Sequence, residues 1–441
     1  MAGSERQARR VITASLIGTS LEWYDFFLYG TAATLVFGKL FFPTFEPLTA
    51  TFLSFTTYAV GFVARPVGGI VFGHFGDRVG RKNILVITLL IMGVSTFLIG
   101  LLPGYATLGI AAPLLLVILR FLQGLGLGGE WGGAVLMSIE HGDPAKRGLN
   151  ASWPQVGVPA GNLLAAAMLG VMSVTLSDDA FLSWGWRVPF LLSGVLVVVG
   201  LWIRLRIAES PLFVEVEQSS KKAKMPVLDV IRSHPRALLS AIASRIGVDV
   251  AFYIFALYIV QYVSGTLGLD RTVGLNAVLI GSACQLVLIP VFGALSDRYG
   301  RRPIYLAGAV SAGVWVFVFF PLIDTGSTLL ITLAAVVALL THALMYGPQA
   351  AFIAELFSTR LRYSGASMGY QIAGVLGGAL APIIAVALLE ATGSTTSISL
   401  YVLGCLALTV VGLAIAPETR DLDLSTGEKP AAGAAVNQTA S

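Results

Sequence analysis

The sequence contains little charge, little cysteine and little histidine. Only 12% of its 441 residues are charged, against about 25% in soluble domains, which excludes an ordinary water-soluble fold. Its two cysteines, Cys284 and Cys405, lie in separate apolar runs, so the sequence indicates neither a disulfide framework nor a cysteine metal site. The four histidines are scattered without metal-ligand spacing: His74, His141, His234 and His342. We therefore expect no bound metal.

Long apolar runs fill the sequence instead. Hydrophobic residues make up 56% of the chain, and a membrane-spanning helix needs about 20 mostly apolar residues. Twelve such runs can be placed, with edges uncertain by several residues. They cover about 12–37, 49–73, 83–102, 111–138, 151–175, 188–206, 237–262, 273–295, 303–323, 328–353, 366–389 and 397–416. We predict an all-α integral membrane protein with 12 transmembrane helices in two six-helix pseudo-symmetric halves.

The basic residues divide the chain and orient it. A polar stretch with Lys221, Lys222 and Lys224 separates the two sets of runs. We predict an N-terminal six-helix bundle at 1–206, a cytoplasmic linker at 207–236, a C-terminal six-helix bundle at 237–418 and a disordered cytoplasmic tail at 419–441. Most Lys and Arg fall in alternate loops counted from the N-terminus, which places both termini in the cytoplasm.

One charged loop occurs twice. Gly73-His-Phe-Gly-Asp-Arg-Val-Gly-Arg-Lys82 has a partner in Gly293-Ala-Leu-Ser-Asp-Arg-Tyr-Gly-Arg-Arg302. The aspartates can accept bonds from helix N-termini, and the arginines can pair with acids that follow the fourth and tenth runs. These residues form a candidate gate: Asp77, Arg78, Arg81, Glu140, Asp297, Arg298, Arg302 and Glu355. A fixed cluster that only sets the topology is the alternative.

Buried polar residues gather on the first, fourth, seventh and tenth runs, which occupy corresponding positions of a three-plus-three repeat. An ionisable side chain at bilayer depth is expensive, so each is a functional hypothesis. The set comprises Glu22, Asp25, Arg120, Gln123, Glu130, Arg245, Asp249, His342, Tyr346 and Gln349.

Structural interpretations remain open for several of these residues. Arg245 and Asp249 are spaced to neutralise each other within one helix, and His342 is equally suited to core packing. Glu22 is suited to a helix contact, which favours Asp25 as the proton-binding group. Arg65, near the end of the second run, is expected to be structural.

Two segments match enzyme motifs but lie in the wrong structural context. Gly124-Leu-Gly-Leu-Gly-Gly129 matches a dinucleotide fingerprint, and Gly365-Ala-Ser-Met-Gly369 matches a nucleophile elbow. Neither follows a predicted strand, as these motifs require. Close helix packing explains the glycines, and we expect no enzymatic activity.

The duplicated loop resembles the signature loop of the major facilitator superfamily. Further motifs resemble its metabolite–proton symporter branch: Leu21-Glu-Trp-Tyr-Asp25, Arg120-Phe-Leu-Gln-Gly124, Gly128-Gly-Glu-Trp-Gly-Gly133, Ser183-Trp-Gly-Trp-Arg187 and Tyr346-Gly-Pro-Gln-Ala-Ala351. The resemblance implies a monomeric carrier of the bacterial inner membrane that moves a small organic solute inward with a proton. Substrates of that branch include shikimate, 2-oxoglutarate, citrate, proline and betaine.

These observations give a mechanistic hypothesis. Asp25, with Glu130, takes a proton, since burial favours the neutral form of a carboxyl group; Glu22 and Asp249 are further candidates. Arg120 and Gln123 bind the substrate carboxylate. The remaining candidate substrate contacts are Tyr29, Tyr253, Tyr346, Gln349, His342 and Arg245.

The partners we expect are an organic acid or zwitterion, protons and lipid. No nucleic acid is expected, and no cofactor beyond the proton gradient. A carrier of zwitterionic osmolytes and a sugar or drug facilitator of the same fold remain alternatives. A sensor is disfavoured by the short linker and tail, and a channel by the lack of a charged pore-lining ring.

Overall fold

The computed structural model of the chain describes residues 2–206, 226–359 and 361–422, which form helices joined by short loops, with no β-strand. Most of the predicted linker, and the predicted tail from 423, lie outside these residues. The first half contains α1 (Ala2–Ala32), η1 (Ala33–Phe37), α2 (Gly38–Phe41), α3 (Pro47–Val79), α4 (Arg81–Leu101), α5 (Tyr105–Leu108), α6 (Ala111–His141), η2 (Pro144–Lys146), α7 (Arg147–Thr175), α8 (Asp178–Ala180), η3 (Phe181–Gly185) and α9 (Arg187–Leu205).

The second half repeats the pattern of long helices. It contains α11 (Pro226–Ser233), α12 (Pro235–Tyr253), η4 (Ile254–Tyr258), α13 (Ile259–Gln261), η5 (Tyr262–Thr266), α14 (Arg271–Tyr299), α15 (Arg301–Asp324), α16 (Thr328–Glu355), α17 (Arg362–Ala373), η6 (Gly374–Ala379), α18 (Ala381–Thr392) and α19 (Thr395–Ile415).

Each predicted apolar run falls on a long helix or on helices joined by a π-helical turn. Within the described residues, 11 helical segments are long and apolar enough to cross a membrane, and the charged α1 is a further long helix of 31 residues. The predicted all-helical, 12-span membrane fold is confirmed. The π-helical turns were not predicted.

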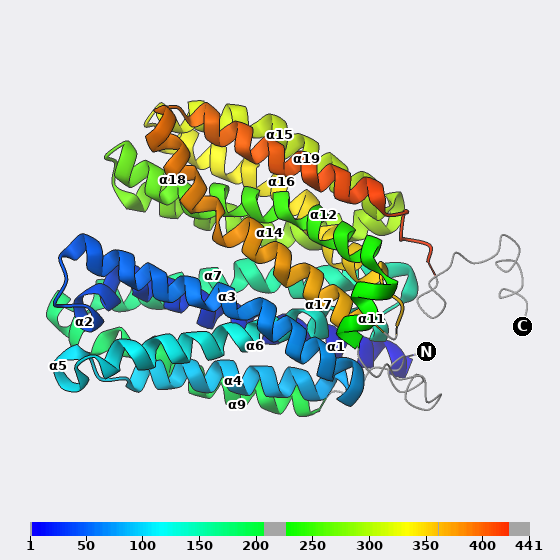
Figure 1. Cartoon of the computed structure of the whole chain (residues 1–441), viewed down its shortest axis with the longest axis horizontal. Helices are drawn as coiled ribbons and strands as arrows, with labels where there is room; N and C mark the ends of the chain where they lie inside the picture. The colour runs from blue at the N-terminus through cyan, green and yellow to red at the C-terminus, as the bar shows by residue number, and fades with distance from the viewer. Residues whose placement is uncertain (1, 207–225, 360, 423–441) are drawn as a thin grey trace, which may run out of the picture.

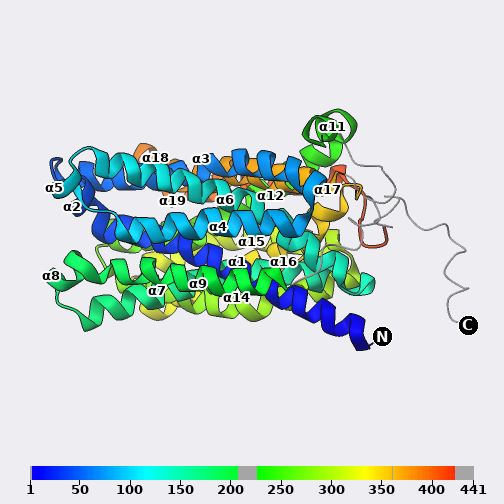
Figure 2. The same cartoon turned by 90° about the horizontal axis from the view of Figure 1, so that it is seen from below.

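The helices form two bundles that lie side by side, with the second tilted against the first (Figure 1). Helices α1 to α9 make one bundle and α12 to α19 the other, and the first turn of α1 and the last turn of α19 lie at the same end of the molecule in both views (Figure 2). We call this the termini end. Between the bundles, α7 packs against α14 and α16, and α3 packs against α17. The functional candidates on α6, α12 and α16 therefore lie close to a bundle interface.

Each copy of the charged loop contains a glycine that makes the turn between two helices. Gly80 turns the chain from α3 into α4 with a φ of 112°, and Gly300 turns it from α14 into α15 with a φ of 100°. Residues other than glycine rarely adopt such φ angles. The two corresponding helix pairs therefore share one turn geometry.

Candidate functional site

Arg120 is completely buried within the first bundle. Its guanidinium carbon lies 4.3 Å, 4.2 Å and 4.6 Å from the ring centroids of Phe26, Tyr29 and Tyr58, within the range of cation–π attraction. Its Nη1 donates to Gln123 Oε1 at 3.1 Å, whereas Nε and Nη2 have no hydrogen-bond partner. Arg120 thus has a positive charge and two nitrogen donors that no described residue binds.

A chain of side chains joins Arg120 to Asp25. Gln123 Nε2 donates to the hydroxyl of Thr96 at 2.7 Å. The Thr96 hydroxyl, which donates to the Met92 carbonyl at 3.0 Å, also lies within reach of the Asp25 carboxyl group. Ser193 Oγ donates to Asp25 Oδ1 at 2.5 Å. The predicted cation and the predicted proton-binding acid therefore belong to one network. Thr96 and Ser193 were missed, because a lone hydroxyl in an apolar helix gives no signal in the sequence.

Arg65 lies in the interior, and not at a helix end as expected. It is 5% exposed, and its guanidinium carbon is 4.0 Å from the Phe26 ring centroid and 4.4 Å from that of Phe62. It lies beside Tyr253 of the other bundle, while Nε and Nη2 have no hydrogen-bond partner among the described residues. Arg65 and Arg120 therefore share the Phe26 ring.

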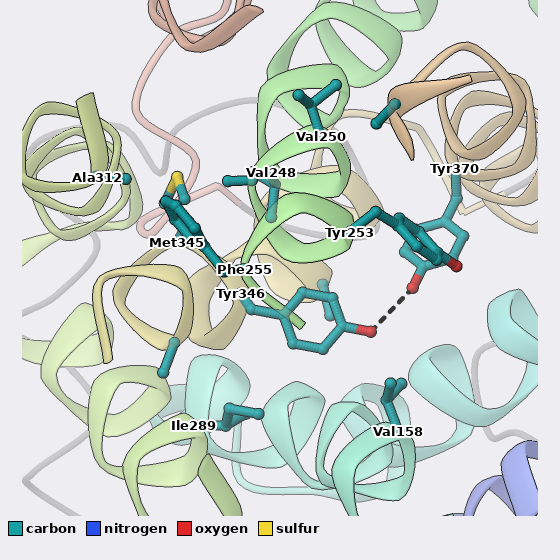
Figure 3. Close-up of a cluster of buried hydrophobic side chains, with 14 of the residues drawn as sticks. Val158, Val248, Val250, Tyr253, Phe255, Ile289, Ala312, Met345, Tyr346 and Tyr370 are labelled. Atoms are coloured by element: carbon teal, nitrogen blue, oxygen red, sulfur yellow. Dashed lines mark hydrogen bonds between the residues drawn. The ribbon is translucent and has the colours of Figure 1, made fainter. Parts of the chain in front are cut away.

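The second bundle contributes a balanced ion pair. Arg245 Nε donates to Asp249 Oδ2 at 2.7 Å. The two charges therefore neutralise each other within one helix, which is the structural alternative given above. The Arg245 guanidinium also lies over the ring of Tyr370 at 2.9 Å. Tyr370 stacks on Trp131 of the first bundle, with centroids 3.6 Å apart. The tyrosine hydroxyls of Tyr346 and Tyr370 point toward one another at 3.1 Å (Figure 3).

The other candidate substrate contacts make bonds inside a single bundle. His342 Nδ1 lies 2.9 Å from Gln285 Nε2, and its ring stacks on Tyr346. Gln349 donates to the Tyr305 hydroxyl at 2.7 Å, and the Tyr29 hydroxyl donates to Thr57 at 2.7 Å. Tyr29 also contacts Arg120 through its ring, whereas the bonds of His342 and Gln349 join them to Gln285 and Tyr305 of the second bundle.

Glu130 lies apart from Arg120, although both are on α6. Ten residues of helix separate them by about 15 Å. Glu130 Oε1 instead accepts from Arg204 Nη2 at 3.3 Å, and the same nitrogen donates to Glu22 Oε1 at 2.8 Å. Arg204 was missed because it stands at the very end of an apolar run.

The candidate gate residues meet at the termini end, with different partners from those expected. Asp297 accepts from the backbone amides of Gly148 and Leu149 at 2.7 Å and 2.9 Å, as the interaction with a helix N-terminus requires. Glu355 pairs with Arg147 at 3.4 Å and with Arg301 at 3.2 Å.

The remaining acid of the gate, Glu140, pairs with Arg362 of the second bundle at 3.4 Å. The expected partners Arg78 and Arg298 are exposed, because each lies on the outer face of the last turn of its helix. Arg302 contributes its backbone amide, which donates to Glu418. The side chains of Asp77 and Arg81 lie outside those that the structure describes.

The segment that follows α19 joins the gate. The tail was predicted to be disordered from Thr419, but the Thr419 hydroxyl donates to Glu355 Oε2 at 2.7 Å and is fully buried. Arg147 donates to the carbonyls of Arg420 and Leu422 at 2.7 Å and 3.0 Å. Side-chain bonding to the gate thus orders the first residues of the predicted tail.

Comparison with known proteins gives consistent matches over nearly the whole chain. Residues 11–241 match the family described as "Sugar (and other) transporter", and residues 246–438 match "Major Facilitator Superfamily". The inner membrane metabolite transport protein YhjE of Escherichia coli (strain K12) is 43% identical, over 94% of this chain and 95% of the relative. The shikimate transporter of the same strain is 40% identical, over 92% and 94%.

More distant matches extend the comparison. The proline/betaine transporter of Salmonella typhimurium is 34% identical, over 92% of this chain and 82% of the relative. Among solved structures, the proton:xylose symporter XylE bound to 6-bromo-6-deoxy-D-glucose superposes with a TM-score of 0.78, over 97% of this chain and 98% of that one. Its identity is 16%, so this match supports the fold alone.

Proposed function

The chain belongs to the major facilitator superfamily and is a multi-pass membrane transporter of metabolites, and from this premise we propose that it takes up a small organic carboxylate together with a proton. Transport proceeds by alternating access in the bacterial inner membrane, with both termini in the cytoplasm. No cofactor beyond the proton gradient takes part.

Two buried guanidinium groups support an anionic substrate. Arg65 and Arg120 contact aromatic rings, and among the described residues no ion pair with a carboxylate is found for either. An unpaired buried charge is costly, and guanidinium binds carboxylates through two parallel hydrogen bonds. Each group still has two nitrogens without a partner. A substrate carboxylate supplies the missing charge and acceptors.

The observation that carries the proposal is the row of polar side chains from Arg120 through Gln123 and Thr96 to Asp25, in which hydrogen bonds join the first three residues. A threonine hydroxyl has one hydrogen to donate. Thr96 has two acceptors within reach, the Asp25 carboxylate and the Met92 carbonyl at 3.0 Å.

The proton on Asp25 decides between these acceptors. An ionised Asp25 takes the Thr96 hydrogen, whereas a protonated Asp25 leaves it to the Met92 carbonyl. Either choice turns the Thr96 hydroxyl hydrogen, and with it the oxygen lone pairs that accept from Gln123, and Gln123 is the acceptor for Arg120. The protonation of Asp25 and the occupancy of Arg120 are thereby linked.

The relatives favour an organic acid over other substrates. The shikimate transporter is more similar in sequence than the proline/betaine transporters, at 40% against 34% identity. Guanidinium groups without an acidic partner also suit an anion better than an ammonium group. Cotransport of one monoanion with one proton moves no net charge across the membrane.

The test follows the pH of a weakly buffered suspension of energy-depleted cells that express the protein. Pulses of shikimate, 2-oxoglutarate, proline, glycine betaine and xylose are added in turn. Alkalinisation with an organic acid, absent in cells without the protein, is the expected result. Uptake of a labelled acid without any pH change would show a uniporter or exchanger and reject the proposal.

Zwitterion transport is the second candidate, favoured by the 34% identity to the proline/betaine transporters. The two candidates differ in their response to voltage, since moving one charge through 100 mV is worth about 2.3 kcal/mol. Proton uptake with a zwitterion accelerates when a potassium diffusion potential makes the vesicle interior negative. Uptake of a monoanion with one proton does not.

A further inference from the structure

We propose that Glu22 and Glu130 bind one proton between them beneath Arg204, and that this carboxyl pair is a second proton site, nearer the termini end than Asp25. The inference deepens the proposed proton-coupled function and rests on it for the direction of proton movement. The presence of the proton itself rests on geometry alone.

The first argument is the balance of charge. Arg204 Nη2 lies 2.8 Å from Glu22 Oε1 and 3.3 Å from Glu130 Oε1, so two acids share one nitrogen of one base. All three side chains are almost fully buried, with Glu22 at 1% and Glu130 at 0% exposure. Two carboxylates and one guanidinium leave a surplus negative charge, and one proton removes it.

The second argument is hydrogen bonding. The Oε2 atoms of both glutamates are buried without a hydrogen-bond partner among the described residues, and the two carboxyl groups are held close together because both Oε1 atoms contact the same Arg204 nitrogen. Two ionised carboxylates offer only acceptors and repel at this separation. A shared proton turns one of them into a donor and makes the contact favourable.

Among the described residues, Arg204 is the cation found in an ion pair with either glutamate. Thr19 of α1 donates to Glu130 Oε1 at 2.9 Å, and the other Arg204 nitrogen, Nη1, donates to the Leu85 carbonyl of α4. Lys82 of α4 donates to the Leu205 carbonyl, at the outer end of α9. Among the described ionisable groups, the nearest acid along α1 is Asp25, one helical turn from Glu22. Thus Arg204 is the counter-charge for both glutamates.

The position suggests what the pair does. Glu22 precedes Asp25 by three residues on α1, which brings it about 4.5 Å closer to the termini end. A proton released by Asp25 after substrate delivery meets the pair before it meets the cytoplasm. The pair accepts that proton and passes its own toward the cytoplasm, so it acts as a relay and does not contact the substrate.

The test reads the proton directly and needs no substrate. Infrared spectra of the purified full-length protein in lipid nanodiscs are recorded at neutral pH, where a protonated buried carboxyl group gives a carbonyl band that shifts on exchange into heavy water. Wild-type protein should show such a band, and it should persist in D25N. Glu22→Gln and Glu130→Gln should each abolish it, because the remaining acid then pairs one to one with Arg204.

Two further variants complete the test. Arg204→Gln should strengthen the band, because both acids lose their cation. Asp249→Asn is the matched control, since Asp249 already has one base to itself, and it should leave the band unchanged. Gel filtration and thermal unfolding establish that each variant is folded. A band that is identical in wild type, E22Q and E130Q would overturn the inference.

The relay is tested separately, with the organic acid that alkalinises the cell suspension in the pH test. E22Q and E130Q should slow net proton-driven uptake several-fold while exchange of labelled for unlabelled substrate stays fast. Net uptake at the wild-type rate in both would reject the relay, even if the band behaves as expected. Failure of every compound to alkalinise the medium would reject the proposed function and leave the infrared result standing.

Discussion

Asp25 and Glu22 stand one turn apart on α1, and their neighbours give them different chemistry. Among the described residues, Asp25 accepts from the Ser193 hydroxyl and lies within reach of the Thr96 hydroxyl, and no ion pair with a base is found for it. Glu22 faces Arg204 and a second acid. At the residue scale, a proton on Asp25 is tied to the substrate network, and a proton on Glu22 is tied to another carboxyl group.

Replacing Asp25 by Asn should abolish uphill accumulation and spare exchange. The amide keeps the size of the side chain and its contact with Ser193, but it cannot take up or release a proton. Accumulation of the labelled substrate against its gradient should fall to the level set by equilibration, whereas counterflow should remain near the wild-type rate.

The matched control for this variant is Asp179→Asn, an exposed acid on α8, which should accumulate substrate as the wild type does. Unaltered uphill uptake by D25N would remove Asp25 from the coupling mechanism. Loss of both uptake and counterflow would indicate a structural role.

At the scale of the helical element, α3 and α6 are held at unusually close range by glycine. A Cβ atom on Gly128 would collide with the backbone carbonyl of Arg65, and one on Gly124 would collide with the carbonyl of Gly61. Small residues allow membrane helices to approach closely. This approach places Arg65 of α3 and Arg120 of α6 on the same Phe26 ring.

Gly128→Ala should therefore destabilise the folded protein. Overpacking a tight contact costs about 1–3 kcal/mol, so the midpoint of thermal unfolding in detergent should fall by several degrees. Gly404→Ala on α19 is the control, because a Cβ there meets nothing within 4 Å. Equal unfolding midpoints for the two variants would show that α3 and α6 can separate without cost.

The sequence could predict the helices and their repetition, but not their register. Apolar runs of sufficient length identify spans, and the loops that contain Gly80 and Gly300 identify the duplication. The partners of Asp25 and Glu22 depend on how α4 and α9 rotate against α1, which leaves no local pattern. The same holds at the gate, where Arg301 is buried and Arg298 is exposed although both belong to one motif.

At the scale of the whole molecule, bonds across the two bundles gather at the termini end in the described part of the chain. Besides the acid–base pairs at that end, two cross-bundle bonds lie nearer the middle of α6, where the Tyr363 hydroxyl donates to the Gly129 carbonyl at 2.6 Å and Gln371 donates to the Gly128 carbonyl at 3.0 Å. These bonds hold that end closed. Alternating access requires them to break when the opposite end closes.

Glu355→Gln should open the termini end. Removing one partner of a buried ion pair costs about 3–5 kcal/mol, and Glu355 serves Arg147, Arg301 and Thr419 together. With Cys284 and Cys405 replaced by alanine, spin labels on exposed positions 79 and 299 should move apart in this variant, as measured by pulsed electron resonance.

Labels at positions 110 and 329, which are exposed at the opposite end, should approach each other in the same variant. Glu390→Gln, an exposed acid on α18, is the control and should leave both distances unchanged. A Glu355→Gln protein with wild-type distances at both ends would show that other contacts keep the gate shut.

In the gate, the acid of each bundle pairs with the base of the other bundle. Glu140 lies in the last turn of α6 and Arg147 begins α7. Glu355 ends α16 and Arg362 begins α17 in the corresponding places, and each acid pairs with the base of the other bundle at 3.4 Å. This is the pattern of a two-fold homodimer, in which one surface meets a copy of itself. A single six-helix chain with one such acid and one such base would find both partners in a second molecule of its own kind. The present chain is, in this respect, a covalently joined dimer.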